Sequence, residues 1–153
     1  MALKAIFEPA HIDIFHRVPG DITAPIAAGT FVMKDEDDAE LVEVSDGTAF
    51  WGILSQDVYL NPGDKFTLPH MNFEAYPGDQ VGIYTEPGYF KTDQYVSGTY
   101  TPGADLYVTN EGKLTDVLDD TEGAPAPSKT TGTLKVGNVV KKDVDGLFFY
   151  FIG

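Results

Sequence analysis

The densest group of ionisable side chains lies between residues 35 and 46, where carboxylates at 35–38, 40, 43 and 46 occur with no basic residue among them. Clustered carboxylates can hold a hard cation such as Ca²⁺, which takes roughly six to eight oxygen ligands. The segment lacks the glycine and the terminal glutamate that an EF-hand loop needs at fixed positions. We therefore interpret it as the solvated tip of a hairpin whose charges discourage pairing with other chains. A bound cation is the alternative.

The histidines His11, His16 and His70 are the next candidate ligands. No two of them stand in the H-x-H or H-E-x-x-H spacing that places two zinc ligands on one side of a strand or helix. The chain has no cysteine, which excludes thiolate ligands, disulfides and cysteine nucleophiles together. The sequence predicts neither a metal site nor another cofactor, and a zinc site assembled from scattered histidines is the alternative.

No pattern of a catalytic centre is found. The serines at 45, 55, 97 and 128 include none in a G-x-S-x-G elbow. Phosphate-binding loops and dinucleotide fingerprints are also missing. Among 24 acidic residues no carboxylate pair stands out, because the partners in a glycosidase are distant in the chain. We predict no catalytic residues and no enzyme, with an acidic hydrolase assembled only by the fold as the remaining catalytic alternative.

Aromatic side chains concentrate in the middle third of the chain. Exposed aromatic rings near acids can stack on sugar rings or anchor a protein interface. Trp51, Tyr89 and Tyr95 are the candidates for such a role. Residues 49–54 have the composition of a buried strand, so packing in the core is the favoured interpretation of Trp51.

The net charge of -14, from 10 basic and 24 acidic residues, limits the partners. Binding to nucleic acid or to an anionic membrane needs a basic surface. The only two adjacent basic residues are Lys141 and Lys142, so we predict no direct contact with nucleic acid or with a membrane. No apolar stretch approaches the roughly 18 residues that span a bilayer. The first residues resemble a weak signal peptide, but Glu8 and Pro9 interrupt the apolar run, so we interpret them as mature sequence.

Frequent turns between short apolar runs predict an all-β fold. Pro-Gly turns with a following aspartate occur at 19–21, 62–64, 77–79 and 102–105, and hairpin signals at 46–47, 110–112 and 145–146. This spacing is typical of a single small β-sandwich or β-barrel-like domain. The predicted strands are 30–33, 41–44, 49–54, 65–68, 80–84, 89–91, 105–108, 113–115, 131–140 and 147–152.

The chain divides into residues 1–28, an extended N-terminal arm or irregular segment, and residues 29–153, the β domain. The first part contains prolines and two histidines but no strong hairpin signal. Residues 119–128 have the composition of a surface loop. The last apolar run, 147–152, does not alternate, so we expect burial on both faces or against a neighbouring subunit.

Several segments together resemble the head decoration, or cement, proteins of tailed bacteriophages. Residues 28–32, the acidic turn and residues 51–58 are similar to the opening of such proteins, and 100–115 to one of their hairpins. The strands at 132–140 and 147–152 resemble their ending. The resemblance covers residues 28–153, and the N-terminal segment and residues 69–78 depart from it.

The resemblance implies a non-enzymatic structural protein that binds the outer surface of the virion capsid and stabilises contacts between subunits of the major capsid protein. It also implies self-association, often as a homotrimer. A glycan- or protein-binding β module of a virion or cell surface is the alternative. The candidate partner contacts are side chains of the N-terminal segment and an aromatic pair, namely Phe7, His11, Ile14, Phe15, His16, Arg17, Tyr89 and Phe90.

Overall fold

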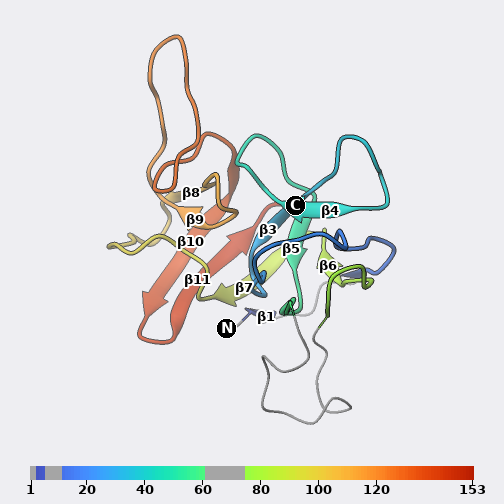
Figure 1. The fold of residues 1–153 in the computed structure, drawn as a ribbon. Helices are drawn as coiled ribbons and strands as arrows, with labels where there is room; N and C mark the ends of the chain where they lie inside the picture. Colours follow the sequence, from blue (N-terminus) through green and yellow to red (C-terminus); the bar gives the residue numbers. More distant parts are fainter. Residues whose placement is uncertain (1–2, 6–11, 61–74) are drawn as a thin grey trace.

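The computed structural model describes residues 3–5, 12–60 and 75–153, and within them the chain is all β (Figure 1). The strands form two antiparallel sheets, and no helix occurs in these ranges. The predicted all-β, sandwich-like fold is confirmed. The strand predicted at 65–68 lies outside the described residues, while each of the other predicted strands overlaps an observed one.

The larger sheet has six strands in the order β1-β7-β11-β10-β8-β9. Its centre is the long hairpin of β10 and β11, whose strands are joined at the hairpin signal predicted at 145–146. The sheet lies on the left in Figure 1. The strand bounds are β1 Leu3–Ala5, β7 Gly88–Thr92, β8 Asp105–Val108, β9 Leu114–Thr115, β10 Lys135–Asp143 and β11 Gly146–Phe151.

The smaller sheet has five strands in the order β2-β6-β5-β3-β4. The acidic segment connects β3 and β4, which pair antiparallel, so the predicted hairpin is confirmed. The strand bounds are β2 Ile12–Asp13, β3 Phe31–Lys34, β4 Val42–Val44, β5 Gly52–Leu54 and β6 Ile83–Tyr84.

An aromatic cluster, here called the inter-sheet core, joins the two sheets. Phe31 of β3 packs edge-on against Phe151 of β11, with ring centroids 5.7 Å apart. Tyr84 of β6 contacts Phe90 of β7 at 5.1 Å. The buried members are Phe31, Ile53, Phe90, Tyr100, Leu106, Val108, Leu114, Val136, Val139, Leu147, Phe149 and Phe151.

A second cluster, here called the outer core, lies on the opposite face of the smaller sheet. Successive strand residues point to opposite faces, so Phe31 and Ile53 enter the inter-sheet core while Val32 and Leu54 enter the outer core. The smaller sheet is therefore buried on both faces. The outer core consists of Val18, Ile26, Val32, Val42, Leu54, Val58, Ala75, Val81 and Ile83.

Residues 12–28 form part of the cover of the outer core, so they are not an extended arm. Val18 and Ile26 are buried, with 1% and 8% of their surface exposed. Backbone hydrogen bonds join Val18 to residues 78 and 79, and Ile26 to Val58. Of the two interpretations of this segment, the irregular one fits. The arm prediction is wrong here because apolar side chains spaced along an irregular chain can still complete a core.

Burial alternates along β11, so the expectation that both of its faces are buried is wrong within the described chain. Leu147, Phe149 and Phe151 are fully buried, whereas Phe148 and Tyr150 are only partly covered on the other face. The sequence does not reveal this alternation, because apolar and aromatic residues occupy successive positions on both faces of the strand.

The turn between β8 and β9, two strands of the larger sheet, is hydrogen-bonded to the smaller sheet. Gly112 adopts a φ of 71°, which favours glycine. Its carbonyl accepts a hydrogen bond of 2.9 Å from the backbone N–H of Phe31 in the other sheet. A Cβ at this position would lie 2.7 Å from the Phe31 carbonyl oxygen, so this close approach requires glycine.

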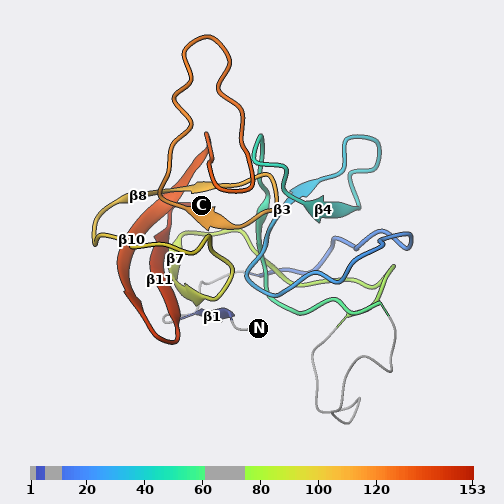
Figure 2. The same ribbon diagram turned by 60° about the vertical axis from the view of Figure 1, so that its left-hand side comes forward.

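The connection between β9 and β10 projects from the body of the domain (Figure 2). Residues 120–126 are exposed, which confirms the predicted surface loop. Asp119 anchors it by accepting hydrogen bonds from the backbone N–H groups of Thr121 and Ala126, at 3.0 Å each.

Candidate partner-binding surface

The carboxylate of Asp13, on β2, organises the turn that follows this strand. Its Oδ1 accepts a hydrogen bond of 2.8 Å from the backbone N–H of Phe15. Its Oδ2 accepts another of 2.8 Å from the indole N–H of Trp51. Asp13 is 8% exposed, so these bonds form largely out of water. One buried carboxylate thus connects the turn to a residue 38 positions away.

His16 completes this cluster from the other side. Its Nδ1 lies 2.8 Å from Oδ2 of Asp13, an ion pair when the imidazole is protonated. Apart from this contact with Asp13, the buried Nδ1 has no hydrogen-bonding partner among the described residues. The imidazole packs against the Trp51 ring, with centroids 5.6 Å apart.

Opposing influences act on the pKa of Asp13. Burial raises it, because a charged carboxylate is poorly solvated there. The hydrogen bonds from Phe15 and Trp51 and the charge of His16 lower it and prevail. The pKa therefore lies below its ordinary value, and the ionised form holds the turn.

Trp51 is fixed from several sides. Its ring packs against the outer core, as the strand composition predicted, and the ammonium of Lys34 lies 3.8 Å from the ring centroid. Such a contact is a cation–π interaction. Trp51 therefore serves as a support for the turn, and its ring face is not open to a ligand.

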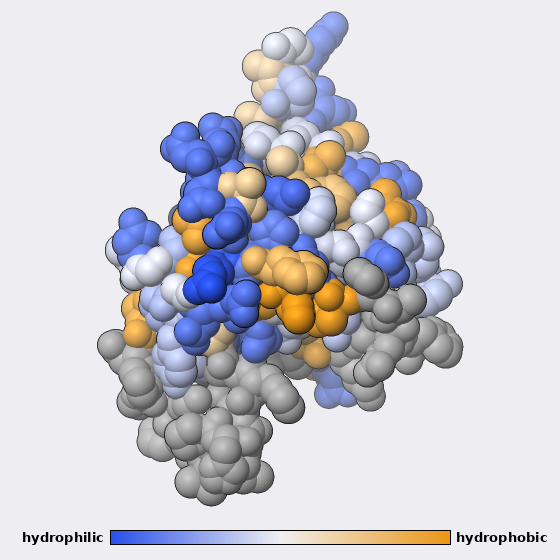
Figure 3. Space-filling view, turned by 90° about the vertical axis from the view of Figure 1, so that its right-hand side faces the viewer, coloured by the Kyte–Doolittle hydropathy of each residue, from blue (hydrophilic) through white to orange (hydrophobic). Residues whose placement is uncertain are grey.

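The turn that Asp13 organises carries exposed apolar side chains. Ile14 is 56% exposed and Phe15 is 77% exposed, and Ile12 on β2 is 41% exposed. Figure 3 views the side of the molecule that carries β6, the partner of β2, and shows an apolar patch bordered by hydrophilic residues. We call Ile12, Ile14 and Phe15 the apolar turn.

The structure brings together Ile14, Phe15, His16 and Arg17, four of the residues predicted as partner contacts. His16 is largely buried, so it supports the turn and offers little surface. Arg17 is exposed, while its backbone pairs with residues 40 and 42 beside β4. The predicted contacts Phe7 and His11 lie outside the described residues, as does the third histidine, His70.

Phe90 is fully buried in the inter-sheet core, so its prediction as a partner contact is wrong. The cause is the alternation of β7, which places adjacent residues on opposite faces. Its neighbour Tyr89 is 39% exposed, on the outer face of the larger sheet. There it contacts Tyr150 and Phe148, with ring centroids 5.0 and 6.1 Å apart.

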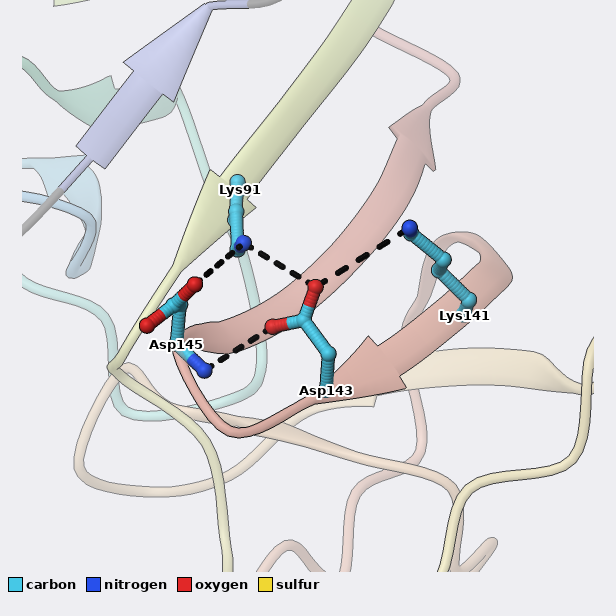
Figure 4. A network of polar contacts seen from close by, with 4 residues as sticks. All are labelled: Lys91, Lys141, Asp143 and Asp145. Carbon is cyan, nitrogen blue, oxygen red and sulfur yellow. Dashed lines mark hydrogen bonds and ion pairs between the residues drawn. The ribbon is translucent and has the colours of Figure 1, made fainter.

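A network of ion pairs borders this aromatic group (Figure 4). The ammonium of Lys91 on β7 lies 3.1 Å from Asp143 and 3.7 Å from Asp145. Lys141 lies 4.0 Å from the same Asp143 oxygen. Hydrogen bonding to Lys91 lowers the pKa of Asp143, so this carboxylate is ionised and the lysine charges are compensated.

The acidic tip uses its carboxylates to shape the hairpin. Asp35 accepts hydrogen bonds from the backbone N–H groups of residues 37 and 38, and Asp38 from that of residue 40. Burial and the charges of Asp35, Asp46 and Glu36 raise the pKa of Glu43. Across the described chain no group of histidines and acids could hold a metal ion.

Asp13 and its bond to Trp51 belong to the candidate site and were not predicted from the sequence. The local signal was present, because an aspartate two residues before a turn N–H often accepts its hydrogen bond. No sequence pattern predicts the contact with Trp51. It joins β2 to the residue that precedes β5, and the order of the strands in a sheet cannot be derived from the sequence.

No pocket is found over the ranges that the structure describes. No helix long and apolar enough to cross a membrane occurs in the same ranges. Comparison with known proteins identifies no relative: no family model, no curated protein and no solved structure matches the chain.

Proposed function

We propose that this protein is a non-enzymatic head decoration protein of a tailed bacteriophage, which binds the outer capsid surface and stabilises contacts between major capsid protein subunits. The observation that carries the proposal is the apolar turn, in which Asp13 holds Ile14 and Phe15 in an exposed position. The resemblance of residues 28–153 to decoration proteins supplies the capsid as the partner.

An exposed phenylalanine in an ordered turn is suited to anchor a protein contact. Burying apolar surface yields about 25 cal/mol per Å², and aromatic side chains supply much of the energy of protein interfaces. The hydrogen bond from Phe15 to Asp13 orders the turn before binding. This ordering lowers the entropy cost of association.

The charge distribution is compatible with this role. A net charge of -14 favours the solubility of the protein before it reaches the capsid. Arg17, exposed next to the apolar turn, is suited to pair with carboxylates of the partner. A homotrimer would present three such turns and bind through avidity.

The test is binding to empty shells assembled from the major capsid protein of the phage whose genome encodes the chain. The wild-type protein is expected to sediment with the shells and to raise the temperature at which they disrupt. Phe15→Ala is expected to weaken this binding by at least about tenfold, the effect of removing one anchor side chain.

Val144→Ala is the matched control, because Val144 is fully exposed at the tip of the β10–β11 hairpin, in the larger sheet, whereas β2 belongs to the smaller one. It should bind as the wild type does. Shells that neither retain the wild-type protein nor gain heat resistance would overturn the proposal. Equal weakening by both variants would remove the apolar turn as the contact.

A further inference from the structure

The outer face of the larger sheet carries an ordered row of side chains across its strands. In the register of the sheet, Tyr89 lies opposite Tyr150, Tyr150 opposite Asn138, and Asn138 opposite Asp105. Residues directly opposite each other point to the same face. The row therefore runs across β7, β11, β10 and β8, from aromatic rings to an amide and a carboxylate.

The aromatic end of the row presents two rings. The centroids of Tyr89 and Tyr150 are 5.0 Å apart, and the rings are inclined by 53° to each other. Tyr89 is 39% exposed and Tyr150 is half-buried. This inclination lets one ring at a time stack on a flat ligand, with the second ring against its edge.

The polar end of the row offers hydrogen-bonding groups that are held in place. Oδ1 of Asp105 accepts a hydrogen bond of 2.9 Å from the amide of Asn138 and lies 2.9 Å from the ammonium of Lys135. Hydrogen bonding to Lys135 is the main cause that lowers the pKa of Asp105, so this group is ionised. An ionised carboxylate and an amide oxygen accept hydrogen bonds from hydroxyl groups.

The charges on this face cancel. Lys135 faces Asp105, while Lys91 and Lys141 face the pair Asp143 and Asp145. Three cations thus meet three carboxylates, on a chain whose net charge is -14. A charged partner gains no net attraction here, whereas a neutral one that brings hydroxyl groups and a flat apolar face matches both ends of the row.

We propose that the outer face of β7, β11, β10 and β8 binds a neutral glycan. The apolar face of one pyranose ring stacks on Tyr89 or Tyr150, and hydroxyl groups of a neighbouring sugar of the same oligosaccharide donate hydrogen bonds to Asn138 and Asp105, because the row spans four strands spaced about 4.8 Å apart. The site is separate from the apolar turn, because Tyr89 belongs to the larger sheet and β2 to the smaller one. It does not depend on the proposed attachment to a capsid.

The other aromatic candidates for sugar stacking are less suited. Trp51 is covered by Lys34 and bonded to Asp13. Tyr95 packs edge-on against Tyr100 at 5.6 Å, and the ammonium of Lys142 lies 5.5 Å from its ring. Neither residue lies beside an amide and a carboxylate in the same cross-strand row.

The test uses the full chain and a panel of neutral oligosaccharides, namely hexamers of glucose, mannose, galactose and N-acetylglucosamine, with sialylated and sulfated glycans alongside. Binding is measured by titration calorimetry. At least one neutral oligomer is expected to bind. Tyr89→Ala and Asn138→Ala are each expected to weaken that binding by about tenfold.

Phe15→Ala is the control for independence, and it should leave glycan affinity unchanged. Near-ultraviolet circular dichroism and thermal melting of Tyr89→Ala and Asn138→Ala verify that both variants are folded. Asn138→Asp, of equal size, adds a carboxylate beside Asp105 and is expected to weaken the binding as well.

Several results would overturn the proposal. Binding of none of the neutral oligomers at 10 mM, in roughly the weakest range of specific ligand affinity, would do so. Binding of the charged glycans alone would do so too. Self-association through this face, seen as a wild-type oligomer that Tyr89→Ala converts to monomers, would assign the face to a second copy of the chain.

Discussion

The two faces of the smaller sheet are covered in different ways. On one face the inter-sheet core lies beneath a second sheet, and its members include aromatic rings from both layers. On the other face the outer core is mostly aliphatic, and irregular chain covers it. Adjacent residues such as Ile53 and Leu54, both fully buried, belong to different cores.

The difference shows that continuous strand pairing is not needed to complete a core. The inter-sheet core is held by ladders such as that of β10 and β11. The outer core is held by single pairs of backbone bonds, for example between Ile26 and Val58 at 3.0 and 2.8 Å. Regions with few shared hydrogen bonds open locally at a lower free energy, so the outer core should be the less stable side.

The largest effect is expected in the inter-sheet core. Phe149→Ala should lower the free energy of unfolding by about 3–5 kcal/mol, because the ring is fully buried and leaves a cavity. Urea unfolding followed by fluorescence measures this. Phe148→Ala, next to it but on the outer face, is the matched control and should cost clearly less. Equal losses would contradict the assignment of the two faces.

A smaller loss is expected in the cover of the outer core. Ile26→Ala should cost about 2 kcal/mol, the low end for such a change, since irregular chain can relax into the cavity. Hydrogen exchange gives the local measure. The amide of Val18, bonded to Asp79, should exchange faster than that of Val139 in β10, bonded to residue 104. The reverse order would contradict the comparison.

The turn at the edge of the outer core should depend on pH through Asp13. Asp13→Asn should cost about 1–3 kcal/mol at neutral pH, the effect of weakening hydrogen bonds to a buried charged group. Because the folded pKa lies below the ordinary value of 3.8, the stabilisation is complete above that value and is lost as pH falls through the folded pKa.

The measurement is urea unfolding of the wild type and of Asp13→Asn between pH 7 and pH 2, and the difference should shrink as the solution is acidified. Asp21→Asn, at an exposed position in the same segment, is the control and should leave stability unchanged. A difference that stays constant down to pH 2 would show that the charge of Asp13 contributes nothing.

The smallest effect is expected at the ion pairs on the outer face of the larger sheet. Lys91→Gln should shift the unfolding midpoint only slightly, because ion pairs at the protein surface, even half-buried ones such as Lys91–Asp143, contribute little to stability. Thermal melting at low and high salt tests this. A clear loss that salt abolishes would show that the network of Lys91, Asp143 and Asp145 supports the hairpin.

Local patterns in the sequence predicted the strands well, because turn residues and alternation act over a few positions. The hairpin at 145–146 and the strand at 105–108 are examples, and the latter matches the observed bounds. The candidate site was predicted in part: Ile14 and Phe15 are exposed, whereas Phe90 is buried. A choice between the two faces of a strand depends on what packs against each face.

By itself the sequence determined an acidic, cysteine-free chain of short strands and tight turns, since composition and turn chemistry are local properties. Only the tertiary structure decided that residues 12–28 cover a second core, that Asp13 binds Trp51, and that Tyr89, Tyr150 and Asn138 share one row. Each of these depends on contacts between segments far apart in the chain. Their order in the sheets is set by the packing of the whole molecule, which no local pattern encodes.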